Sequence, residues 1–304
     1  MAKNVLPTIP AGRADDLHGL DEAENADLVL FMAGNQFMAM DTLLAAFQRC
    51  HPSVKTIFFE TLPPGLELKQ ILAGGAVFKG RTLAIQPDIY TSVSREAMET
   101  LASAGRVAPG EYRPYLRNRL TLMVPAGNPA GISTVTDLGR EGVRISQPDP
   151  ANEDIARHIL RMYADAGGRT LVDRIMEEKR ADGTTVLTVV HHRETPLRIA
   201  KGTVDVGPVW ATEAVHARLS GLAFEEVAPG ETLDQRDRIQ YFAARLRGAP
   251  HPAAADAFLD FLCSTEAQEI FEQFGFVRSG EGGKSTLRLG YRLAQDKEGK
   301  KIRR

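Results

Sequence analysis

Short apolar runs alternate with helix-like segments along most of the chain, and this order constrains the fold more than any other feature of the sequence. The run Leu28–Phe31 ends in the turn Ala33–Gln36, after which apolar residues recur at helical spacing. The same order repeats at Thr56–Phe59, which leads through Glu60–Gly65 into a second helix, and at Pro87–Ser92. Strands that alternate with helices predict an α/β fold, with a parallel sheet covered on both faces.

A second series of the same kind begins in the middle of the chain. Arg119–Pro125, Val143–Ser146 and Val204–Trp210 each read as a strand followed by a loop and a helix. The last third departs from this order: Arg238–Ala244 reads as a strand and Pro252–Phe274 as one long amphipathic helix, which we expect to return to the first series. Two series of strand-to-helix loops predict a ligand site between two facing sheets, because open α/β sheets bind ligands at the carboxyl ends of their strands.

Length and composition agree with a two-part globular protein. The 304 residues suggest about two domains of roughly 150 residues. The chain has 37 basic and 39 acidic residues, a net charge of −2, which favours neither nucleic acid nor an anionic membrane as a partner. Cys50 and Cys263 lack the spacing of a disulfide framework or a zinc site, and we expect both in the core. No apolar run approaches the roughly 18 residues of a membrane-spanning helix.

The two ends of the chain carry little structural signal. Met1–Asp27 contains no apolar segment after a basic end, so it does not read as a secretory signal. A cytosolic protein and a protein from which a signal has been removed both remain open. Asp296–Arg304 is a charged tail that we expect to be solvated.

Four segments carry a resemblance to a known family. Ala253–Phe276, AAADAFLDFLCSTEAQEIFEQFGF, is similar to a closing helix-turn-helix, and Gly207–Ala214 to a Gly-Ile-Val-Tyr-x-Thr-Asp-Ala segment. Asp88–Ser92 and Phe31–Asn35 lie where that family has further strand and loop motifs. On these segments the chain, over Asp27–Val277, resembles the type II periplasmic solute-binding proteins, in particular the molybdate-binding branch of ABC importers.

The resemblance implies a two-lobed architecture. Each lobe would be a mostly parallel sheet flanked by helices, with residues 27–118 plus 241–290 in lobe 1, residues 119–240 in lobe 2, and residues 1–26 and 291–304 as extensions. The lobes would close by a hinge motion on a small, anionic, molybdate-like ligand. The resemblance further implies a monomer without cofactor or catalytic activity, a periplasmic location and an ABC-type membrane permease as the partner.

The family holds its oxyanion with hydroxyl groups and backbone amides at helix starts, and this chain departs from that pattern. Asn35 replaces a serine, Trp210 replaces a tyrosine, and the loop Glu60–Gly65 has two prolines, which lack the amide hydrogen, and an acid that would repel an anion. Arg193 would neutralise the ligand and Trp210 would exclude water. The predicted ligand-binding residues are Asn35, Gln36 and Thr61 of lobe 1 and Asn152, His191, His192, Arg193 and Trp210 of lobe 2.

Other interpretations remain open at these positions. Asn35 and Asn152 could serve only as helix caps, and Thr61 could form a turn. His191 and His192 could bind a transition metal with Glu60, although neighbouring residues of an extended strand point to opposite faces. A small organic ligand, a cytosolic sensor that acts through a protein partner, and an enzyme with His192 as base and Glu60 as acid are further alternatives. No nucleotide-binding or hydrolase motif is present.

Overall fold

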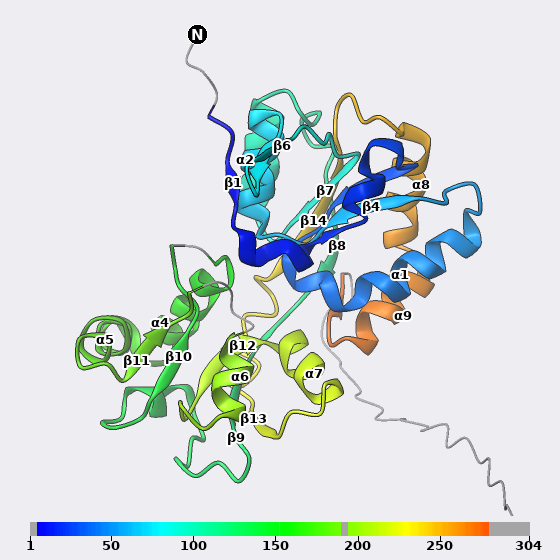
Figure 1. The fold of residues 1–304 in the computed structure, drawn as a ribbon. Helices are drawn as coiled ribbons and strands as arrows, with labels where there is room; N and C mark the ends of the chain where they lie inside the picture. Colours follow the sequence, from blue (N-terminus) through cyan, green and yellow to red (C-terminus); the bar gives the residue numbers. More distant parts are fainter. Residues whose placement is uncertain (1–4, 152, 190–193, 280–304) are drawn as a thin grey trace, which may run out of the picture.

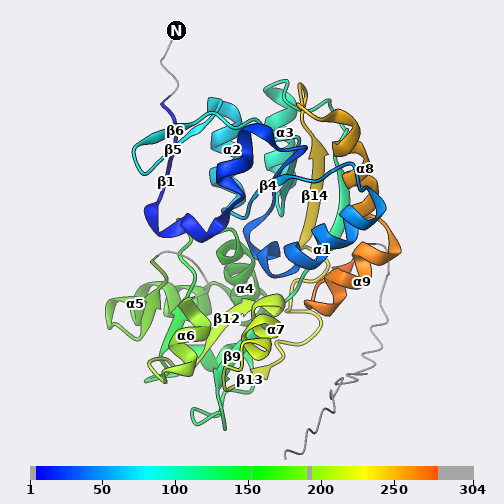
Figure 2. The same ribbon diagram turned by 45° about the vertical axis from the view of Figure 1, so that its right-hand side comes forward.

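The structure is a computed structural model that describes residues 5–151, 153–189 and 194–279. It has two lobes, an upper and a lower one in Figures 1 and 2, each built from a sheet and flanking helices. The predicted two-lobed α/β fold is confirmed. Within the described ranges, no helix is both long and apolar enough to cross a membrane.

The sheet of lobe 1 has seven strands in the order β15-β8-β14-β7-β3-β4-β2. They are β2 (Leu17–His18), β3 (Leu28–Phe31), β4 (Ile57–Glu60), β7 (Ile89–Ser92), β8 (Arg113–Arg117), β14 (Gln240–Arg245) and β15 (Val277–Arg278). Only the pairings of β3 with β4 and with β7 are parallel. The other four pairings are antiparallel, so this sheet is mixed and not mostly parallel as predicted. Strand β14 returns from lobe 2 and enters in the opposite direction between β7 and β8, and β2 and β15 pair antiparallel at the two edges.

Helices cover both faces of this sheet (Figure 1). They are α1 (Phe37–Cys50), α2 (Pro64–Ala73), α3 (Arg95–Ser103), α8 (Pro252–Leu262) and α9 (Thr265–Gln273). Helices α1, α8 and α9 share one apolar core, in which the rings of Phe47 and Phe258 meet edge to face at 5.0 Å. Ile71 of α2 and Met98 of α3 belong to a separate core on the other face.

The end of the chain differs from the sequence prediction in one respect. The single long helix predicted over Pro252–Phe274 is wrong, because Ser264 caps a new helix, its Oγ accepting a hydrogen bond from the Ala267 amide at 3.2 Å. The expectation that Cys50 and Cys263 lie in the core is also wrong, since both are exposed. Each cysteine lies at the end of a helix, beyond the last buried residue of that helix.

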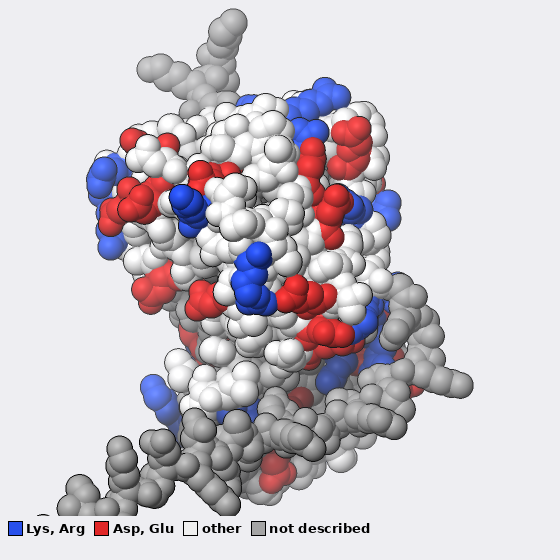
Figure 3. Space-filling model, turned by 90° about the vertical axis from the view of Figure 1, so that its right-hand side faces the viewer, with Lys and Arg blue, Asp and Glu red and all other residues white. Residues whose placement is uncertain are grey.

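The face of lobe 1 that carries α1, α8 and α9 shows basic and acidic side chains interspersed (Figure 3). Ion pairs link neighbouring elements of this lobe, with Arg49 of α1 2.7 Å from Glu266 of α9 and Arg113 of β8 3.0 Å from Asp260 of α8. These pairs are exposed, so each contributes little to stability.

The N-terminal segment forms short elements that extend lobe 1. They are β1 (Thr8–Ile9), η1 (Ala11–Asp16) and η2 (Leu20–Asn25), and β1 joins β5 (Ala76–Phe78) and β6 (Arg81–Leu83) in a small sheet. Strand β2 pairs with β4 at the edge of the main sheet, and the His18 ring stacks on Phe59 at 4.1 Å. Element η1 lies on the side of lobe 1 that faces lobe 2 (Figures 1 and 2).

Lobe 2 is built around three antiparallel strands in the order β12-β9-β13. A parallel pair, β10 and β11, joins them through a bridge between Ile145 and Val206. The strands are β9 (Leu120–Pro125), β10 (Ile145–Gln147), β11 (Thr185–Leu187), β12 (Gly207–Trp210) and β13 (Phe224–Val227). The helices are η4 (Val135–Gly139), α4 (Ile155–Asp173), η5 (Arg174–Glu178), α5 (Lys179–Ala181), α6 (Glu194–Ala200) and α7 (Ala211–Leu219).

The chain crosses between the lobes at two adjacent places. It leaves lobe 1 at Asn118, between β8 and β9, and returns at Ile239, just before β14. The two crossings are hydrogen-bonded, with the Asn118 amide 3.3 Å from the Ile239 carbonyl oxygen. One apolar core runs through them, since Leu116, Leu122 and Ile239 all belong to the same buried cluster.

Candidate functional site

The first predicted ligand loop follows β3 and forms the short turn η3 (Gly34–Gln36). Asn35 and Gln36 are buried, and their side-chain amides point into lobe 1. Asn35 Nδ2 donates to the Tyr241 hydroxyl, and Gln36 Nε2 donates to the Tyr115 hydroxyl. Gln36 Oε1 has no hydrogen-bond partner among the described residues. The hydroxyl groups of two buried tyrosines of lobe 1 therefore orient this loop.

The second predicted loop follows β4 and lies directly against the first. A Cβ atom at Gly34 would lie only 2.9 Å from the Thr61 carbonyl oxygen and 3.0 Å from that of Leu62, so only glycine fits. Thr61 is fully buried; its amide donates to the Asp16 carbonyl oxygen at 2.9 Å, and its Oγ1 is 3.5 Å from His18 Nε2. The N-terminal segment thus holds this loop in place.

Two carboxyl groups are buried beside these loops. Glu60 and Glu67 are both 0% exposed, and Gln70 Nε2 donates to Glu60 Oε2 at 2.9 Å. Burial raises the pKa of Glu60 to about 8, and the nearby Asp16 adds to this effect. Burial, and then the neighbouring Glu60, raise the pKa of Glu67 well above its usual value. Glu60 is therefore mainly protonated and uncharged at pH 7.

Lobe 2 contributes an aromatic pair and a basic side chain. Trp210 is buried at the start of α7, with its ring 5.8 Å from that of His158. Burial and the neighbouring Arg157 lower the pKa of His158 to about 3, so this ring is neutral at pH 7. Arg157 Nη2 donates to the Val93 carbonyl oxygen at 2.7 Å, and Nη1 lies 3.9 Å from Glu96. Arg157 thereby joins α4 of lobe 2 to the loop that follows β7 in lobe 1.

The structure brings together some of the predicted residues and leaves others undescribed. Asn35, Gln36 and Thr61 lie in adjoining loops at one edge of the lobe 1 sheet, and Trp210 lies at the end of β12 in lobe 2. The predicted residues that lie outside the described residues are Asn152, His191, His192 and Arg193. Among the residues that are described, no group of three or more His, Cys, Asp or Glu side chains could hold a metal ion.

Sequence reasoning missed the residues that hold these loops. Tyr115 and Tyr241 lie on β8 and β14, and Asn118 lies at the crossing between the lobes. A tyrosine in an apolar strand reads as ordinary core, so the sequence carries little signal for these roles. The only available hint is that a buried tyrosine hydroxyl usually needs a hydrogen-bond partner.

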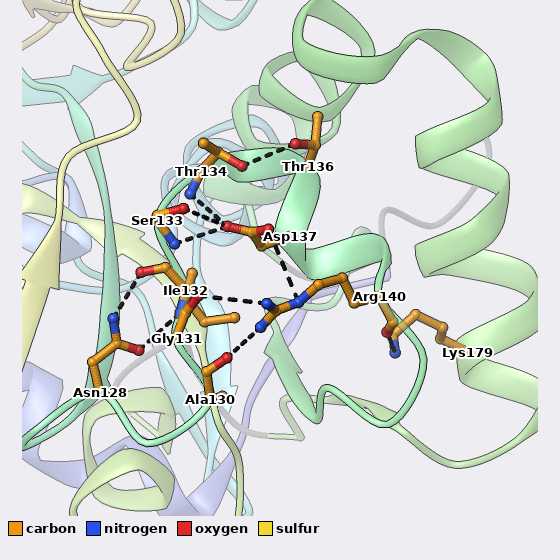
Figure 4. A network of polar contacts seen from close by, with 10 residues as sticks. All are labelled: Asn128, Ala130, Gly131, Ile132, Ser133, Thr134, Thr136, Asp137, Arg140 and Lys179. Atoms are coloured by element: carbon orange, nitrogen blue, oxygen red, sulfur yellow. Dashed lines mark hydrogen bonds and ion pairs between the residues drawn. The ribbon is translucent and has the colours of Figure 1, made fainter.

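A surface cavity of about 410 Å³ opens on lobe 2 and involves none of the predicted residues. Its lining is Pro129, Ala130, Arg140, Glu141, Gly142, Val143 and Asp205. Beside it, Asp137 accepts hydrogen bonds from the backbone amides of Ser133 and Thr134, both at 2.8 Å, and these lower its pKa to about 2 (Figure 4). The Arg140 guanidinium bonds to the Ala130 carbonyl oxygen (Figure 4), so this network braces a turn of lobe 2.

Comparison with known proteins identifies the family of this chain. The model of the family described as bacterial extracellular solute-binding protein matches residues 28–277, which cover both lobes and both crossings. The chain belongs to this family. The resemblance drawn from the closing helices is therefore confirmed, and the segment before residue 28 lies outside the family match.

Individual members of the solute-binding protein family are distant relatives. A putative ABC transporter substrate-binding lipoprotein of Bacillus subtilis, YvgL, is 22% identical over 270 residues, 88% of this chain and 92% of the relative. The molybdate-binding protein ModA of Mycobacterium tuberculosis is 25% identical over 223 residues, 72% of this chain and 77% of the relative. The periplasmic molybdate-binding protein of Azotobacter vinelandii has the same fold, with a TM-score of 0.66 at 17% identity over 83% of this chain and 99% of that protein.

Proposed function

We propose that this solute-binding protein captures a small oxyanion of the molybdate type between its two lobes, outside the cytoplasm, and delivers it to an ABC-type membrane permease. The observation that carries the proposal is the family match across both lobes, together with relatives named for molybdate binding and for ABC transport. The protein would return its ligand unchanged and would therefore not be an enzyme.

The proposed ligand groups of lobe 1 are Asn35, Gln36 and Thr61, which share one edge of the sheet. Each side-chain amide nitrogen carries two hydrogens, and the tyrosine contacts of Asn35 and Gln36 use one of them. Both side chains are buried, so the second hydrogen would reach an anion only after a movement of this loop. The proposed groups of lobe 2 are Asn152, His191, His192, Arg193 and Trp210.

The acid in the second loop does not oppose this proposal. An ionised Glu60 would repel an anion, but burial raises its pKa to about 8, so it is mainly uncharged at pH 7. A protonated carboxyl group donates one hydrogen bond, as a serine hydroxyl does. Glu60 therefore remains compatible with an anionic ligand near neutral pH.

A metal cation is the second candidate ligand, with Glu60, His191 and His192 as its ligands. It is favoured by Glu60 Oε1, a buried oxygen without a hydrogen-bond partner among the described residues. Metal binding would displace the proton of Glu60, so metal affinity would rise with pH while affinity for an anion would not.

A thermal-shift screen followed by calorimetry tests the proposal. Molybdate, tungstate, sulfate, phosphate and divalent metal ions would each be added to the purified protein, since a ligand that binds only the folded state raises the melting temperature. We expect a shift with an oxyanion and an unchanged ligand on recovery. A shift with metal ions alone would select the second candidate, and recovery of a chemically altered ligand would contradict a pure binding role.

The role of Arg193 is tested with the variant Arg193→Gln, and Arg169→Gln is its matched control. Arg169 is highly exposed on α4 and, within the part of the chain that the structure describes, pairs only with Asp173 in the same helix, so its loss should not affect the ligand. Loss of a charge-assisted hydrogen bond should weaken oxyanion binding about tenfold or more in Arg193→Gln. Equal affinities in the two variants would remove Arg193 from the site.

A further inference from the structure

A chain of buried polar side chains links the two lobes through the crossings. Asn118 Nδ2 donates to the Tyr241 hydroxyl at 3.2 Å and to Thr212 Oγ1 at 3.3 Å. Asn35 Nδ2 donates to the same Tyr241 hydroxyl. All four residues are buried, none more than 5% exposed. These hydrogen bonds run from a loop of lobe 1, through Tyr241 of β14 and Asn118 at the first crossing, to the first turn of α7 in lobe 2.

Tyr241 is at the centre of this series of hydrogen-bonded side chains. A tyrosine hydroxyl has two acceptor positions, and Asn35 and Asn118 each donate to it. Burial raises the pKa of Tyr241 well above its usual value, so the hydroxyl stays neutral at any ordinary pH. Asn118 is also held in place, because its Oδ1 accepts the Arg119 amide at 2.8 Å. The position of Thr212 in lobe 2 is therefore tied to that of Asn35 in lobe 1.

The neighbouring residue Gln36 provides an internal comparison. It donates to Tyr115, a second buried tyrosine, whose backbone oxygen accepts a hydrogen bond from Gln268 at 2.9 Å. All three residues belong to lobe 1. Two tyrosines thus hold two adjacent residues of one loop, but only Tyr241 continues through Asn118 to lobe 2.

Contacts between the lobes lie close to this chain. Phe37, at the start of α1, meets the ring of His216 of α7 edge to face at 4.9 Å. A Cβ atom at Gly275 of lobe 1 would lie 3.5 Å from the Thr212 Cα. A hinge rotation that moves α7 away from α1 would stretch or break the hydrogen bond between Asn118 and Thr212.

We propose that Tyr241 and Asn118 are positioning residues of the solute site, which couple the loop at Asn35 to the closure of lobe 2 through Thr212. This inference rests on the proposed function for its ligand, but the coupling itself does not depend on which solute is bound. Ligand contact at the Asn35 loop and closure of the lobes would then stabilise each other, as linkage between two sites requires.

The test uses the full chain with two conservative variants and one matched control. Tyr241→Phe and Thr212→Val keep the shape of each side chain and remove one hydroxyl from the chain, whereas Tyr115→Phe removes the equivalent hydroxyl within lobe 1. Sodium molybdate and sodium sulfate are the probes, measured by calorimetry, and small-angle X-ray scattering with and without the probe reports lobe closure. Thermal melting shows whether each variant folds.

We expect Tyr241→Phe and Thr212→Val to bind the probe about fivefold more weakly than Tyr115→Phe does, the factor that corresponds to one hydrogen bond of about 1 kcal/mol. Both should also have a larger average radius of gyration without ligand. If all three variants match the wild type in affinity and in radius, or change equally, the coupling is refuted. If the wild type binds neither anion, the proposed ligand fails, and the radii of the ligand-free proteins still decide the coupling.

Discussion

At the scale of single residues, the carboxyl of Glu60 is a buried acid in a predicted ligand loop. It lies at the end of β4, fully buried, with one oxygen bonded to Gln70. An acid whose pKa is raised by burial lowers the stability of the folded protein at any pH where the unfolded chain would ionise that acid. This acid belongs to a predicted ligand loop, so the chain keeps a costly group in the proposed binding region.

Replacing Glu60 with glutamine should stabilise the protein in a pH-dependent way. The pKa of Glu60 is raised from 4.5 to about 8 in the folded state. Between these values the folded state holds a proton that the unfolded state has lost, so the wild type loses stability as pH rises from about 4.5 to about 8. Glu60→Gln lacks this loss and keeps an oxygen for Gln70. We expect its advantage in melting temperature to be larger at pH 8 than at pH 5.

The control for this measurement is Glu99→Gln, since Glu99 is an exposed residue of α3. Its stability difference from the wild type should be small and the same at both pH values. A pH-independent difference for Glu60→Gln would show that Glu60 is ionised in the folded protein.

At the scale of elements, the contact between the two lobe 1 loops depends on Gly34. Gly34→Ala would place a methyl group 2.9 Å from the Thr61 carbonyl oxygen, which forces the loops apart. We expect a loss of stability of roughly 1–3 kcal/mol, as for other overpacked sites, and weaker oxyanion binding. Chemical denaturation and calorimetry measure these effects.

Gly65→Ala is the matched variant for Gly34→Ala. Gly65 lies in the first turn of α2, and a Cβ atom there would have no neighbour within 4 Å. Alanine should therefore stabilise this helix by up to about 1 kcal/mol and leave binding unchanged. Similar losses in both variants would contradict the importance of the loop contact.

The sequence predicts the helices and strands better than it predicts the contacts between them. Periodicity identifies β3, β4, β7 and the helices that follow them, because each buries its own apolar stripe. Periodicity missed the break at Ser264, since the apolar spacing continues across it, whereas the resemblance to a closing helix-turn-helix predicted two helices here. The roles of Tyr241 and Asn118 could not be predicted, because residues far apart in the sequence meet only when the chain returns from lobe 2.

At the scale of the whole molecule, the lobes are held together on two sides. Near the crossings the link is the polar chain through Tyr241, and elsewhere it is Arg157, which reaches from α4 to the Val93 carbonyl oxygen. Both contacts belong to the arrangement seen in the structure. A shift toward a more open arrangement would have to break the Arg157 bond.

Arg157→Gln should therefore favour more open lobes. Loss of a hydrogen bond of about 1 kcal/mol would shift the balance between closed and open forms about fivefold. Small-angle scattering of the ligand-free protein should show a larger radius of gyration. Arg161→Gln is the control, because Arg161 lies one turn further along α4 and its only ion-pair partner among the described residues is Asp165 of the same helix, at 3.1 Å. A wild-type radius in both variants would exclude Arg157 as a link between the lobes.

The continuous apolar core has a consequence for how the molecule unfolds. Leu116, Leu122 and Ile239 belong to one large buried cluster that runs through the crossings, and each lobe has only smaller clusters of its own beside it. Melting of one lobe would expose apolar surface of the other, and the two should lose their structure as one cooperative unit. Either lobe, cut out alone, would therefore expose its part of the shared cluster to water, although each has its own sheet and a smaller core.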